Sequence, residues 1–370
     1  MTSRDLSERF ACYDSFLHEQ GGYWQLSAFA QSKWPWAESQ ATIMAKLTAQ
    51  LASLPEITLA NSLKLTKQHI PFWLSNGIQG RKLAQIGGFT ELFSSQHNII
   101  EWCAGKGHLG RILSFHYQRS VTSMEYQSTL CQQGQQLADR FELQQQFIHA
   151  DVMHLPAGWL PNDCAVIALH ACGDLHRRLL EQALQTAHCE LFVAPCCYHL
   201  QAYEHYRPLS QQGQQSNLRI SREQLKFAVQ EQVTGGQRIA SLRDKEQLWR
   251  LVFDIYRAQC TGLHDYQPLP SVAKHWFSGE LHEFVRWACQ QQQLTCPSNT
   301  QLETLLPLAQ RRLELVRSID SVKQLLRQPF ECWLLLDRAL MLAEQGFDVT
   351  LREFCQRQHS PRNVMIIAKR

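Results

Sequence analysis

Asn98-Ile-Ile-Glu-Trp-Cys-Ala-Gly-Lys-Gly-His-Leu-Gly110 joins an apolar run to a glycine-rich turn. The acid of the run, Glu101, stands four residues before the first glycine of a G-x-G-x-x-G pattern. Glycines let the backbone approach a ligand closely, and the helical spacing that follows directs amide donors toward it. The stretch therefore predicts a strand, a nucleotide-cofactor loop and a helix. Taken alone the pattern is weakly specific, because glycines also serve ordinary tight turns.

Further apolar runs follow this loop, and each of them ends in polar residues. They cover residues 121–125, 146–151, 164–170 and 191–196, with helix-forming stretches between them. This order predicts an alternating β/α series with a parallel sheet, whose site lies at the carboxyl ends of the strands. Glu125 lies about 20 residues beyond the turn, the distance at which an acid on the second strand meets ribose hydroxyls.

Composition predicts a globular cytoplasmic protein. The 370 residues are 44% hydrophobic, no stretch reaches the roughly 18 consecutive apolar residues of a membrane helix, and the first residues lack the apolar core of a signal peptide. The thirteen cysteines are interpreted as reduced thiols rather than a disulfide framework. A net charge of +3 permits a nucleic-acid partner without arguing for one. The sequence does not indicate an oligomeric state.

Three parts are expected along the chain. Residues 1–95 form a helical N-terminal cap, residues 96–202 and 329–370 form the cofactor-binding core, and residues 203–328 form a helical insertion. Near the C-terminus, residues 331–344 have the pattern of a strong helix that Gly346 ends. Residues 347–355 and 363–368 are expected to be two strands of a closing hairpin.

With this hairpin, the chain resembles the class I S-adenosylmethionine-dependent methyltransferases, whose seven-stranded sheet ends in such an antiparallel pair. Four motifs resemble, more narrowly, the branch that contains methyltransferase-like protein twenty-five and its bacterial relatives. They are Leu169-His-Ala-Cys-Gly-Asp-Leu175, Pro195-Cys-Cys-Tyr-His199, Leu336-Asp-Arg338 and Ser360-Pro-Arg-Asn363. The resemblance implies an α/β, Rossmann-like methyltransferase sheet, with the helical cap and insertion added, and S-adenosyl-L-methionine as the cofactor.

The resemblance also implies which residues bind the cofactor. Carboxylates accept hydrogen bonds from ribose hydroxyls and an exocyclic amine, and glycine amides donate to a carboxylate. The implied contacts are Glu101, Cys103, Ala104, Gly105 and Gly107 at the methionine part, Glu125 at the ribose and Asp151 at the adenine, with Tyr126, Val152 and His170 as further cofactor contacts. Cys103 stands where the family more often has glycine.

Catalytic residues are expected where the fourth and fifth strands end, because neighbouring parallel strands bring their carboxyl ends together. The candidates are His170 as a base or cofactor contact, Cys197 as a thiol, and Tyr198 or His199 to orient the acceptor.

The cysteines near these strand ends have three interpretations. Cys172 and Cys197 are placed for thiolate attack on a pyrimidine ring. A metal site could use His170, Cys172, Cys196, Cys197 and His199, but adjacent cysteines lack the usual C-x₂₋₄-C spacing, and the sequence predicts no metal. The third interpretation is that they are buried small hydrophobic residues.

The function expected is methyl transfer by in-line displacement, with RNA (tRNA or rRNA) as the acceptor and no membrane partner. The RNA expectation rests on family analogy and on basic residues in the insertion. Protein or small-molecule acceptors stay open, as does a scaffold that keeps the fold without catalysis. An NAD-dependent oxidoreductase is the alternative from another class, because the glycine pattern with Glu125 also satisfies the dinucleotide fingerprint. Glu101, Asp151 and the hairpin favour the methyltransferase.

Overall fold

The computed structural model describes residues 1–59, 70–229 and 237–370. Their helices begin with α1 (Ser3–Glu19), α2 (Gly21–Trp24), η1 (Ala28–Ala30), α3 (Gln40–Leu51), α4 (Phe72–Ser75), α5 (Gly80–Leu92), α6 (His108–Tyr117), α7 (Ser128–Arg140), η2 (Val152–His154) and α8 (Asp174–Leu184). The later ones are α9 (Gln211–Gln214), α10 (Arg222–Leu225), η3 (Lys226–Val229), α11 (Gln237–Thr261), η5 (Lys274–Ser278), α12 (Leu281–Gln292) and α13 (Asn299–Glu344). Among the described helices, none has both the length and the apolar character that crossing a membrane requires.

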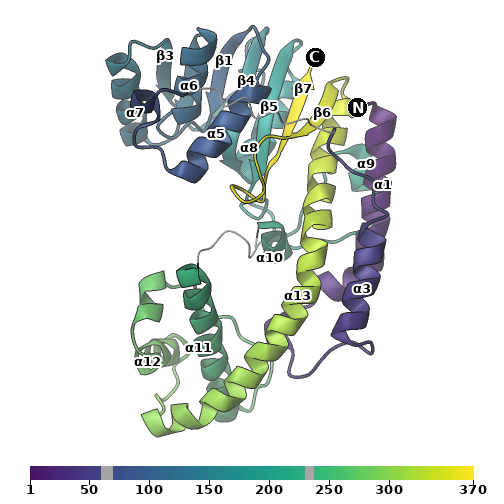
Figure 1. Ribbon diagram of the computed structural model, residues 1–370, viewed down its shortest axis with the longest axis vertical. Coiled ribbons are helices and arrows are strands. Elements are labelled where there is room, and N and C mark those ends of the chain that lie inside the picture. Colours follow the sequence, from purple (N-terminus) through teal and green to yellow (C-terminus); the bar gives the residue numbers. More distant parts are fainter. Residues whose placement is uncertain (60–69, 230–236) are drawn as a thin grey trace. The chain divides into compact units, whose positions relative to one another are not determined.

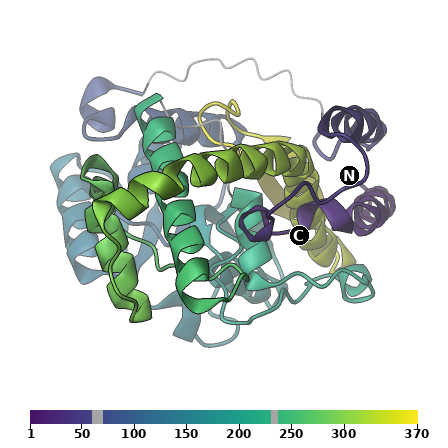
Figure 2. The same cartoon turned by 90° about the horizontal axis from the view of Figure 1, so that it is seen from below.

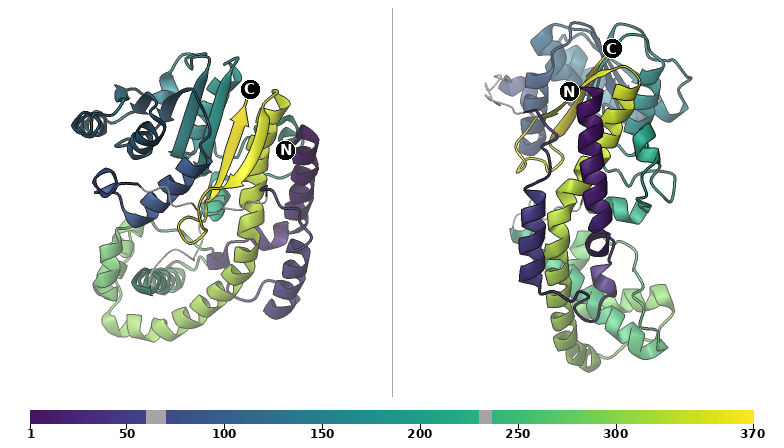
Figure 3. Two further views of the ribbon diagram at one scale, coloured as in Figure 1. Left: turned by 45° about the horizontal axis from the view of Figure 1, so that its top comes forward. Right: turned by 90° about the vertical axis from the view of Figure 1, so that its right-hand side faces the viewer.

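A seven-stranded mixed sheet carries the fold. Its strands are β1 (Asn98–Trp102), β2 (Val121–Glu125), β3 (Gln145–His149), β4 (Cys164–Cys172), β5 (Cys189–Cys196), β6 (Asp348–Glu353) and β7 (Val364–Lys369). The order is β3-β2-β1-β4-β5-β7-β6, with β1 to β5 parallel and β7 antiparallel to both its neighbours. Figure 1 and the left view of Figure 3 show β6 and β7, in yellow, at one edge. The predicted fold class and the closing hairpin are confirmed.

Helices cover both faces of the sheet. On one face, Gly110 of α6 lies against Glu101 and Val121, and Gly134 of α7 lies against the ring of Phe147. On the other face, the indole of Trp102 donates a hydrogen bond of 3.0 Å to the carbonyl of Leu175 in α8. The strand residues alternate between the two faces, so both sides of β1 and β4 are buried, as expected for parallel strands.

The described residues divide into two compact units. The first combines residues within 1–19, 54–234 and 327–370, and it contains the sheet. The second combines residues within 20–53 and 235–326. These boundaries do not follow the predicted cap, core and insertion, since segment 203–229 belongs with the sheet and residues 20–53 with the helices of the second unit. The division into cap, core and insertion therefore stays a prediction.

The second unit has its own apolar core. Phe253 of α11, Phe284 of α12 and Val316 of α13 are fully buried in one cluster, and the helices that carry them can be followed in Figure 2. A buried carboxylate, Asp254, pairs with two guanidinium groups, at 2.9 Å from Arg257 and 2.7 Å from Arg312. The pairing compensates the desolvation of all three charges.

The helix expected at residues 331–344 is the end of a longer helix, which corrects the predicted start. α13 runs without interruption through 46 residues, although Pro329 lies inside it. Proline in a helix interior costs about 3 kcal/mol. Leu326 and Phe330, on either side of Pro329, are fully buried, and Arg327 pairs with Glu331 at 3.0 Å. Packing therefore sustains the helix where local sequence favours a break.

α5 packs closely on the segment that follows β6. Two adjacent glycines of α5 differ in how near they lie to this segment. A Cβ atom at Gly88 would lie 1.6 Å from the carbonyl oxygen of Phe354, whereas a Cβ at Gly87 would meet nothing within 4 Å. The backbone carbonyl cannot move aside as a flexible side chain could. Gly88 is therefore required for the approach of the two segments, and Gly87 is not.

We predict that Gly88→Ala destabilises the protein by about 1–3 kcal/mol or more, because it overpacks a buried contact. The matched control Gly87→Ala should be neutral or stabilising by up to about 1 kcal/mol, because alanine is the better helix former. Urea unfolding of both variants measures the two effects. Equal destabilisation by the two substitutions would contradict the close packing at Gly88.

Candidate active site

The strand order reverses between β1 and β4, and this reversal marks the place where ligands bind in open α/β sheets. The loops that follow the carboxyl ends of β1, β2, β3, β4 and β5 all lie at the same edge. The residues predicted from the sequence lie in these loops or in the last residues of the strands before them. The structure therefore brings the predicted cofactor contacts and the predicted catalytic residues to one edge of the sheet.

The loop after β1 turns through three left-handed residues, with φ of 57° at Cys103, 60° at Gly105 and 62° at Gly107. A Cβ at Gly107 would lie 2.4 Å from the side chains of Gln145 and Phe147, so this glycine packs inward. A Cβ at Gly105 would meet nothing within 4 Å. Gly105 thus leaves its surface open to a ligand. Burial raises the pKa of Cys103 to about 12, so its thiol stays neutral.

Glu125 at the end of β2 holds this loop. One carboxylate oxygen accepts the N–H of Gly105 at 2.9 Å, and the other accepts the N–H of Gln127 at 2.9 Å. A carboxylate oxygen has two lone pairs, so each oxygen can accept a further hydrogen bond. The next residue, Tyr126, is 67% exposed. Glu125 therefore joins the glycine loop to the second strand and keeps capacity for hydroxyl donors.

Asp151 follows β3 and begins the short helix η2. Its carboxylate accepts the N–H of Met153 at 3.0 Å and contacts Nδ1 of His154 at 2.8 Å. The bond from the Met153 amide, followed by that from His154, lowers the pKa of Asp151. Val152 beside it is buried. The acid is thus an ionised acceptor at the third strand end, the position predicted for it.

Glu101 lies beneath the loop, in a buried position. Its carboxylate accepts the hydroxyl of Ser123 at 2.7 Å and the N–H of Gly110 at 3.1 Å. Burial raises its pKa from 4.5 to about 7, against the opposing effect of these hydrogen bonds. In the structure, Glu101 contacts the scaffold: it ties β1 to β2 and to the first turn of α6. Lys82 of α5, which the sequence did not single out, is close enough to act on its charge.

The raised pKa of Glu101 predicts a pH dependence of stability. Between pH 4.5 and about 7 the folded state keeps a proton that the unfolded state releases, so the free energy of unfolding falls as the pH rises through this window. Glu101→Gln removes the part of this decrease in unfolding free energy that is due to Glu101, because an amide does not ionise. The amide oxygen can still accept the N–H of Gly110, and the amide nitrogen can donate to the hydroxyl of Ser123. The variant should be more stable than the parent at pH 8 by about 3 kcal/mol at most.

Denaturant unfolding at several pH values measures this difference. Glu331 is also buried with its pKa raised to about 7, so the parent curve contains both acids and only the difference between the proteins isolates Glu101. Parallel pH curves for parent and variant would show that Glu101 ionises as freely in the folded state as in the unfolded one.

Three thiols meet where β4 and β5 end. The sulfur atoms of Cys172, Cys196 and Cys197 all lie within 4.8 Å of one another, and the Sγ atoms of Cys172 and Cys196 are 3.2 Å apart. Cys196 is buried, and the other two are half-buried. The pairing predicted between the two strand ends is confirmed by the register, in which Cys172 lies opposite Cys196.

Unusual backbone conformations build this cluster. His170 and Cys197 have left-handed φ angles of 72° and 48°, and the register of β4 against β5 shifts between Leu169 and Cys172. Gly173 has φ of 58°, and a Cβ there would lie 1.7 Å from the carbonyl oxygen of Leu200. The two loops are therefore tightly packed against each other. Non-glycine residues in such conformations each cost on the order of 1–3 kcal/mol and concentrate at functional sites.

The two histidines of the predicted site differ in their surroundings. His170 belongs to the exposed edge. Partial desolvation lowers the pKa of its ring, and the charges of Lys82 and Arg362 lower it further. His199 is half-buried, and its Nδ1 atom has no hydrogen-bond partner within the described residues. Both rings lie beside the cysteine cluster in sequence.

Tyr198, which the sequence predicts as a residue that orients the acceptor, has its side chain in the core. Its side chain is 1% exposed, and the guanidinium of Arg338 lies over its ring at 4.7 Å. The ring of His176 approaches it edge-on at 6.0 Å. Tyr198 is thus turned into the core, whereas its neighbour Cys197 is half-buried beside the other two thiols. Tyr198 thus anchors the loop.

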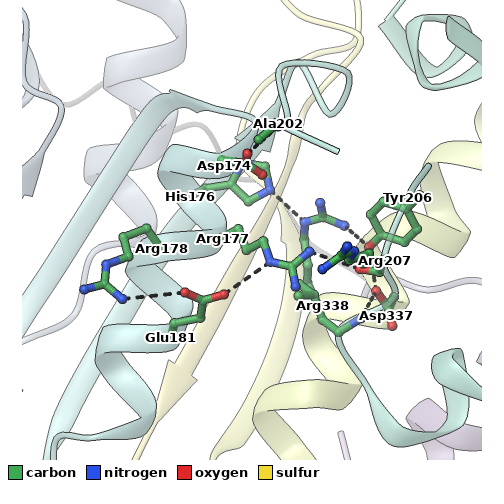
Figure 4. Close-up of polar contacts among 11 residues, drawn as sticks. Asp174, His176, Arg177, Arg178, Glu181, Ala202, Tyr206, Arg207, Asp337 and Arg338 are labelled. Carbon is green, nitrogen blue, oxygen red and sulfur yellow. Dashed lines mark hydrogen bonds and ion pairs between the residues drawn. The ribbon is translucent and has the colours of Figure 1, made fainter. Parts of the chain in front are cut away.

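Figure 4 shows the buried polar network behind this loop. Arg338 of α13 donates to Nε2 of His176 at 2.8 Å and to the hydroxyl of Tyr206 at 3.0 Å. The neighbouring Asp337 accepts four hydrogen bonds. The donors are the hydroxyl of Tyr206, the hydroxyl and the backbone N–H of Ser210, and the N–H of Leu209. The Leu336-Asp-Arg338 motif therefore fixes α8 and the segment after β5 against α13. Its role follows from this network, which sequence reasoning did not reveal.

Part of the chain matches a known protein family in sequence. Residues 81–203 match the family model described as a methyltransferase domain. This part of the chain is therefore similar to a methyltransferase domain. A search of curated proteins found no match to this sequence. The matched segment contains the glycine loop, Glu125, Asp151 and the whole cysteine cluster.

Solved structures with a similar fold are methyltransferases of several kinds. The 23S rRNA methyltransferase ErmE is 16% identical, with 31% of this chain and 46% of that chain covered at a TM-score of 0.24. Coclaurine N-methyltransferase, bound to N-methylheliamine and SAH, is 13% identical, with 52% of this chain and 58% of that chain covered at a TM-score of 0.26. Geranyl diphosphate C-methyltransferase from Streptomyces coelicolor A3(2) is 11% identical, with 42% of this chain and 64% of that chain covered at a TM-score of 0.26. The match spans less than two thirds of each of these chains, and such low scores carry no acceptor over to this chain.

Proposed function

We propose that this protein is an S-adenosylmethionine-dependent methyltransferase that modifies RNA, either tRNA or rRNA. The observation that carries the proposal is the meeting, at one sheet edge, of an open glycine loop, two acids at successive strand ends and a cysteine-histidine cluster. The four motifs quoted from the sequence support placing it in the branch of methyltransferase-like protein twenty-five. Thirteen free cysteines fit the reducing cytoplasm.

The residues at the edge fit this cofactor. Gly105 leaves room beside the loop, and Glu125 keeps lone pairs for two ribose hydroxyls. Asp151, which stays ionised, can accept from an exocyclic amine. Cys103 and Ala104 add small side chains that do not fill the loop. When bound, S-adenosylmethionine supplies a methyl group activated by a positively charged sulfur.

The protein's part in such a reaction is to position the acceptor and to receive its proton. His170 and His199 flank the cysteine cluster, and either imidazole can accept a proton from a hydroxyl or amine. The thiol of Cys197 lies at the same edge. Tyr198 and Arg338 hold this loop from the core side, so they act as positioning residues. The burial of these two side chains keeps the loop in one conformation.

Surface chemistry around the edge favours RNA over a small apolar acceptor. Tyr126 is 67% exposed and Tyr203 is 42% exposed, and the guanidinium of Arg207 lies 3.3 Å from the ring centre of Tyr203. Exposed aromatic rings stack on unpaired bases, and cationic side chains contact phosphates. A protein or a small molecule remains the alternative acceptor, and the labelling experiment below distinguishes them.

We predict that Glu125→Ala weakens binding of S-adenosylhomocysteine by roughly 10- to 100-fold, the effect of removing hydrogen bonds to a charged group. The matched control is Asp139→Ala, since Asp139 is an exposed acid on α7 away from the strand ends. Isothermal titration calorimetry with S-adenosylhomocysteine and, separately, NAD measures binding. Selective binding of NAD by the parent protein would instead assign it to the oxidoreductases.

RNA from a strain that lacks the gene should accept labelled methyl groups. Purified protein with radiolabelled S-adenosylmethionine is expected to transfer label to deletion-strain RNA and little to parent-strain RNA, whose sites are already modified. The label should be lost on nuclease treatment and survive protease, and Glu125→Ala should abolish most of it. Label that survives nuclease and is lost to protease would overturn the RNA acceptor.

A further inference from the structure

The cysteine cluster offers three sulfur atoms to one point in space. Cys172, Cys196 and Cys197 come from two neighbouring strand ends, and their sulfur atoms lie within 4.8 Å of one another. Two thiolates bound to one zinc ion lie about 3.8 Å apart, since each Zn–S bond is about 2.3 Å and the geometry is tetrahedral. The three sulfurs are therefore already near the spacing that a single ion requires.

The adjacency of two of the cysteines does not prevent this arrangement. The sequence argued against a metal because two adjacent cysteines lack the usual C-x₂₋₄-C spacing, and consecutive residues of a regular strand would also point to opposite faces. Cys197 instead has a left-handed φ of 48°, so it departs from regular strand geometry, and its sulfur lies within 4.8 Å of the sulfur of Cys196. The tight contact between Gly173 and the carbonyl of Leu200 holds both loops in these conformations. The three thiols thus converge in loops whose backbone is strained.

Charge and access also suit a cation. Three thiolates and one divalent ion carry a net charge of −1, and Arg362 lies close enough to Cys172 and Cys197 to act on them electrostatically. Cys172 and Cys197 are half-buried, so an ion can enter from the solvent side. His199, two residues beyond Cys197, has a buried Nδ1 atom without a partner within the described residues.

We propose that Cys172, Cys196 and Cys197 bind one zinc ion as three thiolates. Binding releases the three thiol protons and forms three Zn–S bonds. Three protein ligands with a fourth position free are the pattern of catalytic zinc sites, whereas structural sites use four. Soft sulfur ligands select zinc over magnesium or calcium. This site does not depend on the proposed methyl transfer, since an ion can bind whether or not a methyl donor does.

Cobalt(II) substitution tests the site directly. The full-length protein, reduced and freed of metal with a chelator, is titrated with Co²⁺ and then with Zn²⁺, and absorption is recorded. We expect one cobalt per chain, an intense thiolate-to-cobalt charge-transfer band, the visible bands of tetrahedral cobalt, and displacement of the cobalt by zinc. Elemental analysis of protein purified without chelator should find zinc.

Single alanine variants of the three cysteines are each expected to weaken cobalt binding at least about tenfold and to reduce the charge-transfer band. Cys164→Ala is the matched control, because Cys164 is a buried thiol at the opposite end of the same strand. Circular dichroism checks that each variant folds. S-adenosylhomocysteine binding, measured on the same samples, separates loss of the metal from loss of the methyl-donor site.

Absence of a charge-transfer band from the reduced parent protein would overturn the proposal without reference to any variant. So would a band that all three cluster variants retain, since the ion would then lie elsewhere. A Cys172–Cys196 disulfide that forms on exposure to peroxide, in a protein that takes up no metal when reduced, would assign the cluster to thiol–disulfide chemistry and likewise overturn the zinc site.

Discussion

The buried carboxylate of Glu101 is the interaction on which the cofactor edge depends. It joins three elements at once, through Ser123 of β2, the first turn of α6 at Gly110, and its own strand β1. Gly110 is required there because a Cβ would lie 2.4 Å from that carboxylate. The acid thus ties β1 to β2 and to the first turn of α6, which follows directly on the left-handed Gly107. Its desolvation is the energetic cost of fixing the loop.

Local sequence predicted much of the sheet. Runs such as 121–125 have apolar residues buried on both faces, and a parallel sheet is the fold that buries them so. The glycine loop, Glu125 and Asp151 were predictable because strand ends in such a sheet meet at one edge. Tyr198 was not, since only the kinked backbone at Cys197 decides which of two neighbours faces the core. The continuity of α13 through Pro329 depends on tertiary packing in the same way.

The long-range network behind the β5 loop was beyond prediction for another reason. Asp337 and Arg338 are adjacent residues of one helix, yet their partners lie on α8 and in the segment after β5, more than a hundred residues away. Nothing in local periodicity pairs Arg338 with His176. Once buried, the two charges need partners, because an unpaired ion in the core costs several kcal/mol. The network therefore fixes His176 in the tautomer that accepts from Arg338 while donating to the carbonyl of Ala171.

That fixed imidazole connects the helix core to the cysteine edge. Ala171, its acceptor, lies between His170 and Cys172, so the position of the β4 end is set by a hydrogen bond from behind. The ring of Tyr198 packs against the guanidinium of Arg338, and this contact sets the position of the β5 end. The two loops that carry the thiols are thus held by one buried guanidinium. The left-handed residues beside the thiols are strained, and strained conformations persist only where the surroundings over-determine them. Here the surroundings do so through Arg338, which contacts both His176 behind the β4 end and Tyr198 at the β5 end.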